Sequence, residues 1–109
     1  FHLAAVGFRS GGDAVAREGS IAAGDRAAWE AAVARARRAG KPIFVDFWAT
    51  WCKNCTVMER TTFADERVRA RLATYEVVKV QAEKPDREPA RGMLEAFGVR
   101  GLPGFAVLK

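Results

Sequence analysis

The sequence contains few of the residues that build metal centres and disulfide-stabilised folds. Among its 109 residues there are two cysteines, Cys52 and Cys55, and one histidine, His2. A structural zinc site needs about four ligands, so this set supplies none unless two chains share a metal. A scaffold of several disulfides is also excluded. We expect no metal and no small-molecule cofactor, and the two close cysteines point to a catalytic use of the pair.

Long apolar runs are also missing. No stretch approaches the roughly 18 apolar residues of a membrane-spanning helix, and the N-terminus lacks the pattern of a signal peptide. The chain opens with Phe1 instead of Met, and we interpret it as a mature form or as a piece of something longer. Half of the residues are apolar, which is enough for the core of one domain.

An excess of positive charge is present, but it does not predict nucleic-acid binding. The formal charge is +5, from 18 Lys and Arg against 13 Asp and Glu. A nucleic-acid interface needs basic residues clustered with exposed aromatics, or a known module. Here the bases are spread over expected helix faces, where a solvated surface explains them. We therefore expect no nucleic-acid partner.

The stretch 43–59 organises the chain. Residues 43–49 are almost continuously apolar and rich in aromatic and β-branched side chains, which predicts a strand buried on both faces. The second half of the stretch has the spacing of a helix. Cys52-Lys53-Asn54-Cys55 lies at the junction, and a cysteine pair at a strand–helix junction is typical of a dithiol redox site.

The physical reason for this placement is the start of the helix. The first turn carries unpaired N–H groups and a partial positive charge, which stabilise a thiolate. Cys52 would occupy that position, and Cys55 would lie one turn deeper, within reach of the Cys52 sulfur and better shielded from solvent. We expect Cys52 to attack a partner disulfide and Cys55 to resolve the mixed disulfide.

Three other interpretations of the pair stay open. It could be a structural disulfide, although so short a loop constrains the unfolded chain little. It could hold a metal shared between two chains. The two cysteines could also be unreactive core thiols.

Two segments resemble a known family. Asp-Phe-Trp-Ala-Thr-Trp-Cys-Lys-Asn-Cys at 46–55 looks like the active-site segment of thioredoxin-fold proteins, and Gly-Val-Arg-Gly-Leu-Pro-Gly at 98–104 looks like that family's cis-proline loop. Lys41-Pro42, Glu59 and Thr62-Phe63-Ala64-Asp65 make the chain similar to the C-terminal periplasmic domain of the transmembrane reductant conductor DsbD. The resemblance covers roughly residues 25–109 and leaves 1–24 as an N-terminal extension or linker.

The resemblance implies an α/β, thioredoxin-like three-layer sandwich around a central mixed sheet. It also implies a periplasmic dithiol reductant, part of a larger inner-membrane protein, that relays electrons from a membrane-embedded dithiol to another periplasmic thiol protein. Two alternatives remain: a free-standing thioredoxin-like protein-disulfide reductase, and a non-catalytic docking module that senses redox state.

Two carboxylates are candidates for tuning the dithiol. Asp46 lies inside the apolar strand, where burial should raise its pKa, and the resemblance implies that it takes the proton from Cys55. A structural ion pair, for example with Lys79, is the alternative. Glu59 falls one helical turn after Cys55. The resemblance implies that it makes Cys52 less acidic, and an exposed helix Glu is the alternative.

Further residues are expected around the cysteines. The resemblance places Leu102 and a cis Pro103 beside Cys52, where an extended partner segment can pair with the backbone. We expect Gly104, in place of a larger residue, to widen this groove. Trp51 is a candidate docking surface, with simple packing as the alternative. Lys53 and Asn54, between the cysteines, are expected to bias the redox potential.

The remaining elements follow from periodicity and capping signals. Asp25 is expected to cap a helix that packs through Trp29 and ends at Gly40. Further expectations are a short strand in 3–8, a helix capped by Asp65 that buries Val68 and Leu72, a strand over 76–82, a helix after Pro89 that stops at Gly98, and a strand over 105–108. The thioredoxin fold ordinarily continues with an edge strand and a covering helix, so we expect both to be lacking here and the 109 residues to be marginally stable or self-associating.

Overall fold

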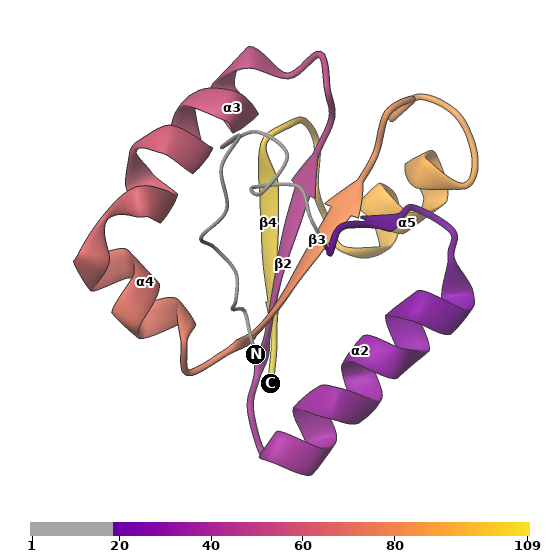
Figure 1. Cartoon of the computed structure of the whole chain (residues 1–109). Coiled ribbons are helices and arrows are strands. Elements are labelled where there is room, and N and C mark those ends of the chain that lie inside the picture. Colours follow the sequence, from indigo (N-terminus) through magenta and orange to yellow (C-terminus); the bar gives the residue numbers. More distant parts are fainter. Residues whose placement is uncertain (1–18) are drawn as a thin grey trace.

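A four-stranded mixed sheet forms the centre of the protein. The computed structural model describes residues 19–109 (Figure 1), so the predictions for His2 and for a strand in 3–8 fall outside the described residues. The strand order is β1-β3-β2-β4. The strands are β1 (Ile21–Ala22), β2 (Ile43–Trp48), β3 (Glu76–Gln81) and β4 (Gly104–Leu108). β3 runs parallel to both β1 and β2, and β4 runs antiparallel to β2. The predicted mixed sheet is confirmed.

β1 is an element that the sequence did not predict. Ile21 and Ala22 pair with Val80 and Gln81 at the end of β3. The sheet therefore begins before residue 25, inside the segment expected to be an extension. Two residues give no periodic pattern, so only the finished sheet identifies this strand.

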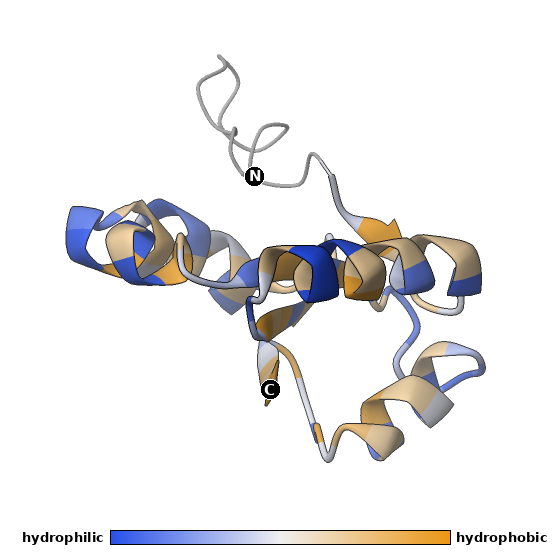
Figure 2. Cartoon of the chain, turned by 90° about the horizontal axis from the view of Figure 1, so that it is seen from below, coloured by the Kyte–Doolittle hydropathy of each residue, from blue (hydrophilic) through white to orange (hydrophobic). Residues whose placement is uncertain are grey.

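Helices cover both faces of the sheet and complete the three-layer arrangement. α2 (Arg26–Ala39) and α5 (Ala90–Ala96) pack on one face, and α3 (Lys53–Arg60), the 3₁₀ turn η1 (Thr62–Ala64) and α4 (Glu66–Leu72) form the other layer (Figure 1). In Figure 2 the helices show hydrophilic and apolar segments in alternation, as expected of helices that cover a core with one side.

The caps of α2 match the sequence signals. The Asp25 carboxylate accepts a hydrogen bond from the Ala28 N–H at 3.1 Å, which satisfies one unpaired donor of the first turn. At the other end Gly40 takes a left-handed conformation, with φ of 66°, that a side chain would disfavour. Trp29 packs edge-on against Phe97, at 5.7 Å between ring centroids. The predicted helix is confirmed with its start and its end.

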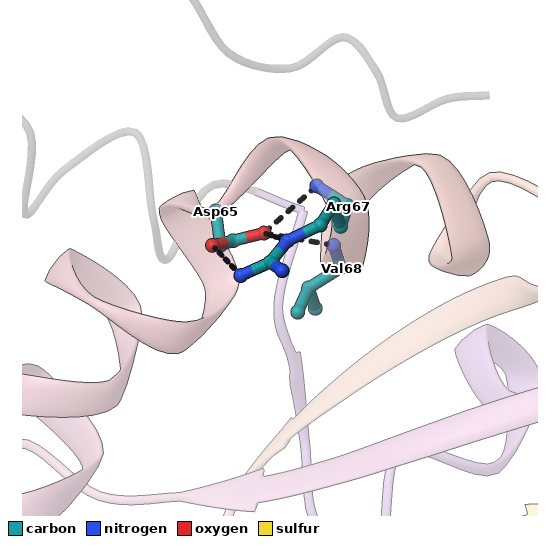
Figure 3. A network of polar contacts seen from close by, with 3 residues as sticks. All are labelled: Asp65, Arg67 and Val68. Atoms are coloured by element: carbon teal, nitrogen blue, oxygen red, sulfur yellow. Dashed lines mark hydrogen bonds and ion pairs between the residues drawn. The ribbon is translucent and has the colours of Figure 1, made fainter.

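Asp65 separates η1 from α4, as predicted. Its carboxylate accepts from the N–H groups of Arg67 and Val68, at 2.8 and 3.3 Å, and the Arg67 guanidinium closes over it (Figure 3). The hydrogen bonds from Arg67, with that from Val68, lower the pKa of Asp65. The predicted burial of Val68 and Leu72 is wrong: both are only half-buried, because α4 lies at the margin of the sheet and has no fully buried residue.

β2 divides the interior into two faces because successive side chains of a strand point to opposite sides. Ile43, Val45 and Phe47 enter the core beneath α2 and α5. That core consists of ten buried residues: Ala32, Ala36, Ile43, Val45, Phe47, Val78, Val80, Ala82, Ala90 and Leu94. Phe44, Asp46 and Trp48 point the other way, toward the layer of α3. The only acid on β2 therefore faces the helix that carries the cysteines.

Aromatic rings fill the α3 side of the sheet below Asp46. Phe44 packs against Phe63, Tyr75 and Phe105, with centroid distances of 6.3, 6.2 and 5.7 Å. Phe63 comes from η1, so the break between α3 and α4 inserts a ring between helix and sheet. On β4, Phe105 and Val107 are 37% and 48% exposed.

Candidate functional site

The cysteine pair lies where β2 ends and α3 begins, as the sequence predicts. Cys52 is the N-cap of α3, and its sulfur accepts a hydrogen bond from the Cys55 N–H at 3.2 Å. The two residues form a disulfide, with 5.3 Å between their Cα atoms. Since the Cys55 N–H of the first turn points at the Cys52 sulfur, the helix start can stabilise negative charge there.

The two cysteines are buried almost equally, which corrects one expectation. Cys52 is 4% exposed and Cys55 is 5% exposed, so Cys55 is not the better protected of the two. The reason is that Trp48 and Ala49 pack around both cysteines, and Leu102 covers them from the opposite loop. Little of Cys52 is therefore open to a partner.

A small cavity below the disulfide brings the predicted carboxylates together. Asp46, Cys55, Glu59 and Lys79 all line it, and its volume of about 10 Å³ is near the least that can hold one water molecule. Asp46 is 5% exposed. Burial raises the pKa of Asp46 to about 6; Lys79 opposes this shift and Glu59 adds to it. The cavity thus places beneath Cys55 an acid that changes its protonation state near neutral pH.

Lys79 binds both carboxylates, but not equally. Its ammonium donates a hydrogen bond to Glu59 Oε1 and lies 4.0 Å from Asp46 Oδ2. The Glu59 side chain is 19% exposed, so it is not the exposed helix residue of the alternative interpretation. The sequence suggested Lys79 only as a partner of Asp46, which is its neighbour across the β2–β3 register. The closer contact with Glu59 depends on how α3 lies over the sheet.

The loop opposite the cysteines carries the predicted cis-proline. The Leu102–Pro103 peptide bond is cis, and Pro103 lines the same cavity as Cys55. The Glu88–Pro89 bond is also cis, which the sequence did not indicate.

The prediction that Gly104 widens the groove is wrong. A Cβ at this buried position would lie 2.2 Å from Val99 Cγ1 and 2.8 Å from the Gly101 carbonyl oxygen. The Val99 side chain therefore already occupies the space that a larger residue would take.

Trp51, Lys53 and Asn54 surround the site at the surface. Trp51 is 57% exposed, and its indole N–H donates to the Glu83 carbonyl at 2.7 Å. Lys53 and Asn54 are exposed in the first turn of α3. Sequence reasoning missed Glu83, which follows β3 and reaches the residues just before Cys52. No motif marks it, because the contact exists only once the ends of β2 and β3 lie side by side.

This arrangement can exchange two electrons between thiols and a disulfide. A helix start stabilises a thiolate on Cys52, Cys55 closes the bond, and Asp46 can hold or release a proton at the cavity. Over residues 19–109 no group of three or more His, Cys, Asp or Glu side chains is placed to hold a metal ion. None of the helices of that range combines the length and the hydropathy that crossing a bilayer requires.

Comparisons with known proteins agree with this chemistry. The chain is 40% identical over 77 residues to thiol:disulfide interchange protein DsbD 1 of Pseudomonas aeruginosa and 45% identical over 73 residues to DsbD of Ralstonia nicotianae. These matches cover 70% and 66% of this chain but only 13% and 12% of the relatives, so the chain spans a small part of their length.

Solved structures give the same picture. The oxidised C-terminal domain of Neisseria meningitidis DsbD superposes with a TM-score of 0.65 at 25% identity, covering 83% of this chain and 77% of that domain. A thioredoxin from Thermus thermophilus gives a TM-score of 0.59 at 25% identity, covering 72% of this chain and 59% of that one.

The family model described as thioredoxin-like matches residues 25–109, which include both cysteines, Asp46 and the cis-proline loop. With its mixed sheet and its disulfide at the start of α3, this thiol–disulfide oxidoreductase domain belongs to the thioredoxin-like family.

Proposed function

We propose that this chain is a protein-disulfide reductase domain that works in the periplasm as part of an inner-membrane protein. It receives two electrons from a membrane-embedded dithiol and passes them to another periplasmic thiol protein. One observation carries the proposal: Cys52 and Cys55 share the start of α3 above a cavity that holds a buried acid. The similarity to DsbD proteins supports the direction of electron flow and the compartment.

The reaction has two exchange steps. The Cys52 thiolate attacks one sulfur of the acceptor disulfide, which forms a mixed disulfide and releases the other acceptor sulfur as a thiolate that takes up a proton. The Cys55 thiol then loses its proton and attacks Cys52 Sγ. The Cys52–Cys55 disulfide forms, the second acceptor thiol leaves, and two electrons have passed to the acceptor. A membrane-embedded dithiol reverses both steps to restore the reduced pair.

Asp46 is the proposed acceptor of the Cys55 proton. Both residues line the cavity, and its size suits one water molecule as a bridge. An acid with a pKa of about 6 is mostly ionised at neutral pH and can take a proton there. At lower pH it is already protonated and cannot.

Glu59 is proposed to disfavour the Cys52 thiolate and so to make the dithiol a better reductant. Its carboxylate adds negative charge to the wall of the cavity beneath the cysteines. Negative charge near a thiol disfavours the thiolate. We therefore expect that Glu59→Gln and Asp46→Asn each increase the thiolate fraction of Cys52. Ultraviolet absorbance of the reduced protein measures this fraction. An unchanged thiolate titration in both variants would refute this role.

Insulin reduction tests the enzymatic part. The native chain should reduce insulin disulfides with dithiothreitol as electron source, Cys52→Ser should abolish the reaction, and Cys55→Ser should accumulate the mixed disulfide. A reduction potential near thioredoxin's, about −270 mV or lower, fits a reductant, whereas one near −120 mV would identify an oxidant. If the native chain leaves insulin intact, the non-catalytic sensing module is the better interpretation.

A chimera tests the relay. This chain would replace the C-terminal domain of Neisseria meningitidis DsbD, and alkylation of free thiols would report whether the periplasmic acceptor is kept reduced. Reduced acceptor with the native chain and oxidised acceptor with Cys52→Ser would support the relay. An acceptor that stays oxidised in both, beside normal insulin reduction, would favour a free-standing reductase. The likeness to the Thermus thermophilus thioredoxin supports that second candidate.

A further inference from the structure

Glu83 binds Thr50 and Trp51, the two residues directly before Cys52. Its carboxylate accepts hydrogen bonds from the Thr50 N–H, at 3.1 Å, and from the Thr50 hydroxyl. Its backbone carbonyl accepts from the Trp51 indole N–H at 2.7 Å. The Gln81 side-chain amide donates to the same carboxylate at 2.8 Å, which fixes the carboxylate against β3. One residue thus connects β3 to the approach to the dithiol.

The segment that Glu83 binds is a turn whose two central residues are exposed. The Cys52 N–H donates to the Ala49 carbonyl at 3.1 Å, so the backbone closes a four-residue turn around Thr50 and Trp51. Ala49 and Cys52, at its two ends, are buried in the packing around the disulfide. Thr50 and Trp51 are both exposed. Among residues 19–109, Glu83 supplies hydrogen bonds that can orient both residues.

An ionised carboxylate suits this position because the Thr50 N–H, the Thr50 hydroxyl and the Gln81 amide all donate to it. A carboxylate only accepts hydrogen bonds, and bonds to a charged acceptor are stronger than bonds between neutral groups. Gln at the same place keeps an amide oxygen for two of the donors, and the Thr50 hydroxyl can turn to accept from its amide N–H. Alanine keeps none of these bonds. The series Glu, Gln, Ala at position 83 therefore weakens and then removes the hydrogen bonds to Thr50 and Gln81.

Trp51 is the part of this turn that a partner meets. It exposes 57% of its surface, whereas Cys52 beside it exposes 4%. We expect a protein disulfide that approaches Cys52 to contact the exposed ring, and a small disulfide to need no such contact. Orientation of Trp51 should therefore matter for protein substrates and little for small ones.

We propose that Glu83 is a positioning residue, which holds the Thr50–Trp51 turn so that Trp51 is in place to receive the protein partner of Cys52. The proposal rests on the proposed reductase function of this same site. Glu83 itself touches neither sulfur and takes no part in the exchange.

The test compares a protein disulfide with a small one, using the full chain. Glu83→Ala should raise the KM for insulin about tenfold, the factor expected from losing roughly one charge-assisted hydrogen bond, with kcat little changed. Glu83→Gln should recover most of the loss. The reaction of the reduced protein with 5,5′-dithiobis(2-nitrobenzoate) should stay within about twofold in both. Glu95→Ala, an exposed Glu on α5, is the matched control.

Hydrogen exchange of the Trp51 indole N–H gives a second readout that needs no activity. Its acceptor is a backbone carbonyl, which alanine retains, so faster exchange in Glu83→Ala reports movement of the turn. Thr50→Val, which removes one bond and no charge, covers the case in which Glu83→Ala does not fold and should show a smaller increase in KM and exchange.

Three results would overturn the proposal: an unchanged indole exchange, an unchanged KM for insulin, or an equal loss with both disulfides. If the native chain fails to reduce insulin, the proposed reductase function is wrong. The exchange rate of the Trp51 indole N–H then decides by itself whether Glu83 orients the turn.

Discussion

Replacing Asp46 by Asn should stabilise the protein, and only above the pH at which Asp46 ionises in the unfolded chain. Asp46 is 5% exposed inside β2, and its pKa is raised from 3.8 to about 6, chiefly by burial. The folded protein therefore holds the proton more tightly than the unfolded chain does. Asn has nearly the same shape but carries no charge at any of these pH values, so it avoids the cost of a buried carboxylate.

The sign and size of the effect follow from proton linkage. Between pH 3.8 and about 6 the folded state binds a proton that the unfolded state has released, so the free energy of unfolding falls as pH rises through this window. A shift of this size corresponds to about 3 kcal/mol, fully lost above pH 6. Asp46→Asn should therefore match the native protein near pH 4 and exceed its stability by up to about 3 kcal/mol near pH 8.

The measurement is urea unfolding of the oxidised protein at a series of pH values, followed by tryptophan fluorescence. The quantity compared is the difference in free energy of unfolding between Asp46→Asn and the native chain, at equal m-values. Asp86→Asn, in the exposed loop after β3, is the control and should show no such pH dependence. A constant difference across the pH range, or a variant less stable near pH 8, would refute the assignment of a buried, reluctantly ionised acid.

Three further expectations concern the same end of the sheet. If Asp46 accepts the Cys55 proton, the rate of mixed-disulfide resolution in stopped-flow experiments falls as pH drops through about 6, and Asp46→Asn removes that dependence. Because Glu59 raises the pKa of Asp46, Glu59→Gln should lower it, and NMR titration of the Asp46 carboxyl measures the change. Gly104→Thr should lower the free energy of unfolding in urea by about 1–3 kcal/mol, because its Cβ meets Val99, and Val99→Ala should restore part of the loss.

Each of the three has a result that contradicts it. A resolution rate in the native protein that does not vary with pH excludes Asp46 as the acceptor. An Asp46 titration that does not move in Glu59→Gln means that the two carboxylates are not coupled through the cavity. Strictly additive losses at positions 99 and 104 would mean that the two side chains do not compete for one space.

The active-site segment could be predicted from the sequence because its signals are local. The apolar run before Cys52 predicts β2, and the change of period predicts α3. Asp25 and Asp65 mark helix starts with side chains that bind their own neighbours, and Gly40 marks a helix end with its left-handed backbone. The cis geometry before Pro103 followed from resemblance, and the structure confirms it. In each case the interaction lies within a few residues or within a motif that the family shares.

The features that could not be predicted depend on contacts between distant segments. β1 is too short to show a period, and only pairing with β3 defines it. The contacts of Lys79 with Glu59 and of Glu83 with Thr50 join residues 20 and 33 positions apart. The space at Gly104 was misjudged because Val99, which fills it, belongs to the same loop but shows no pattern that reveals its direction.

The ring of Phe63 contributes both to the aromatic layer and to the wall of the cavity around Asp46. It packs with Phe44 and Phe105 in the aromatic layer, and it also forms part of the wall around Asp46, with the Lys79 ammonium 5.8 Å from its centroid. The Phe63 side chain, which packs η1 against the sheet, thus also helps to exclude solvent from Asp46. Shortening this side chain would lower the pKa of Asp46 toward its ordinary value and leave both cysteines in place. Substitutions of apolar residues around Asp46 can therefore change how proton uptake accompanies thiol–disulfide exchange in this domain. They need not alter Asp46 or either cysteine.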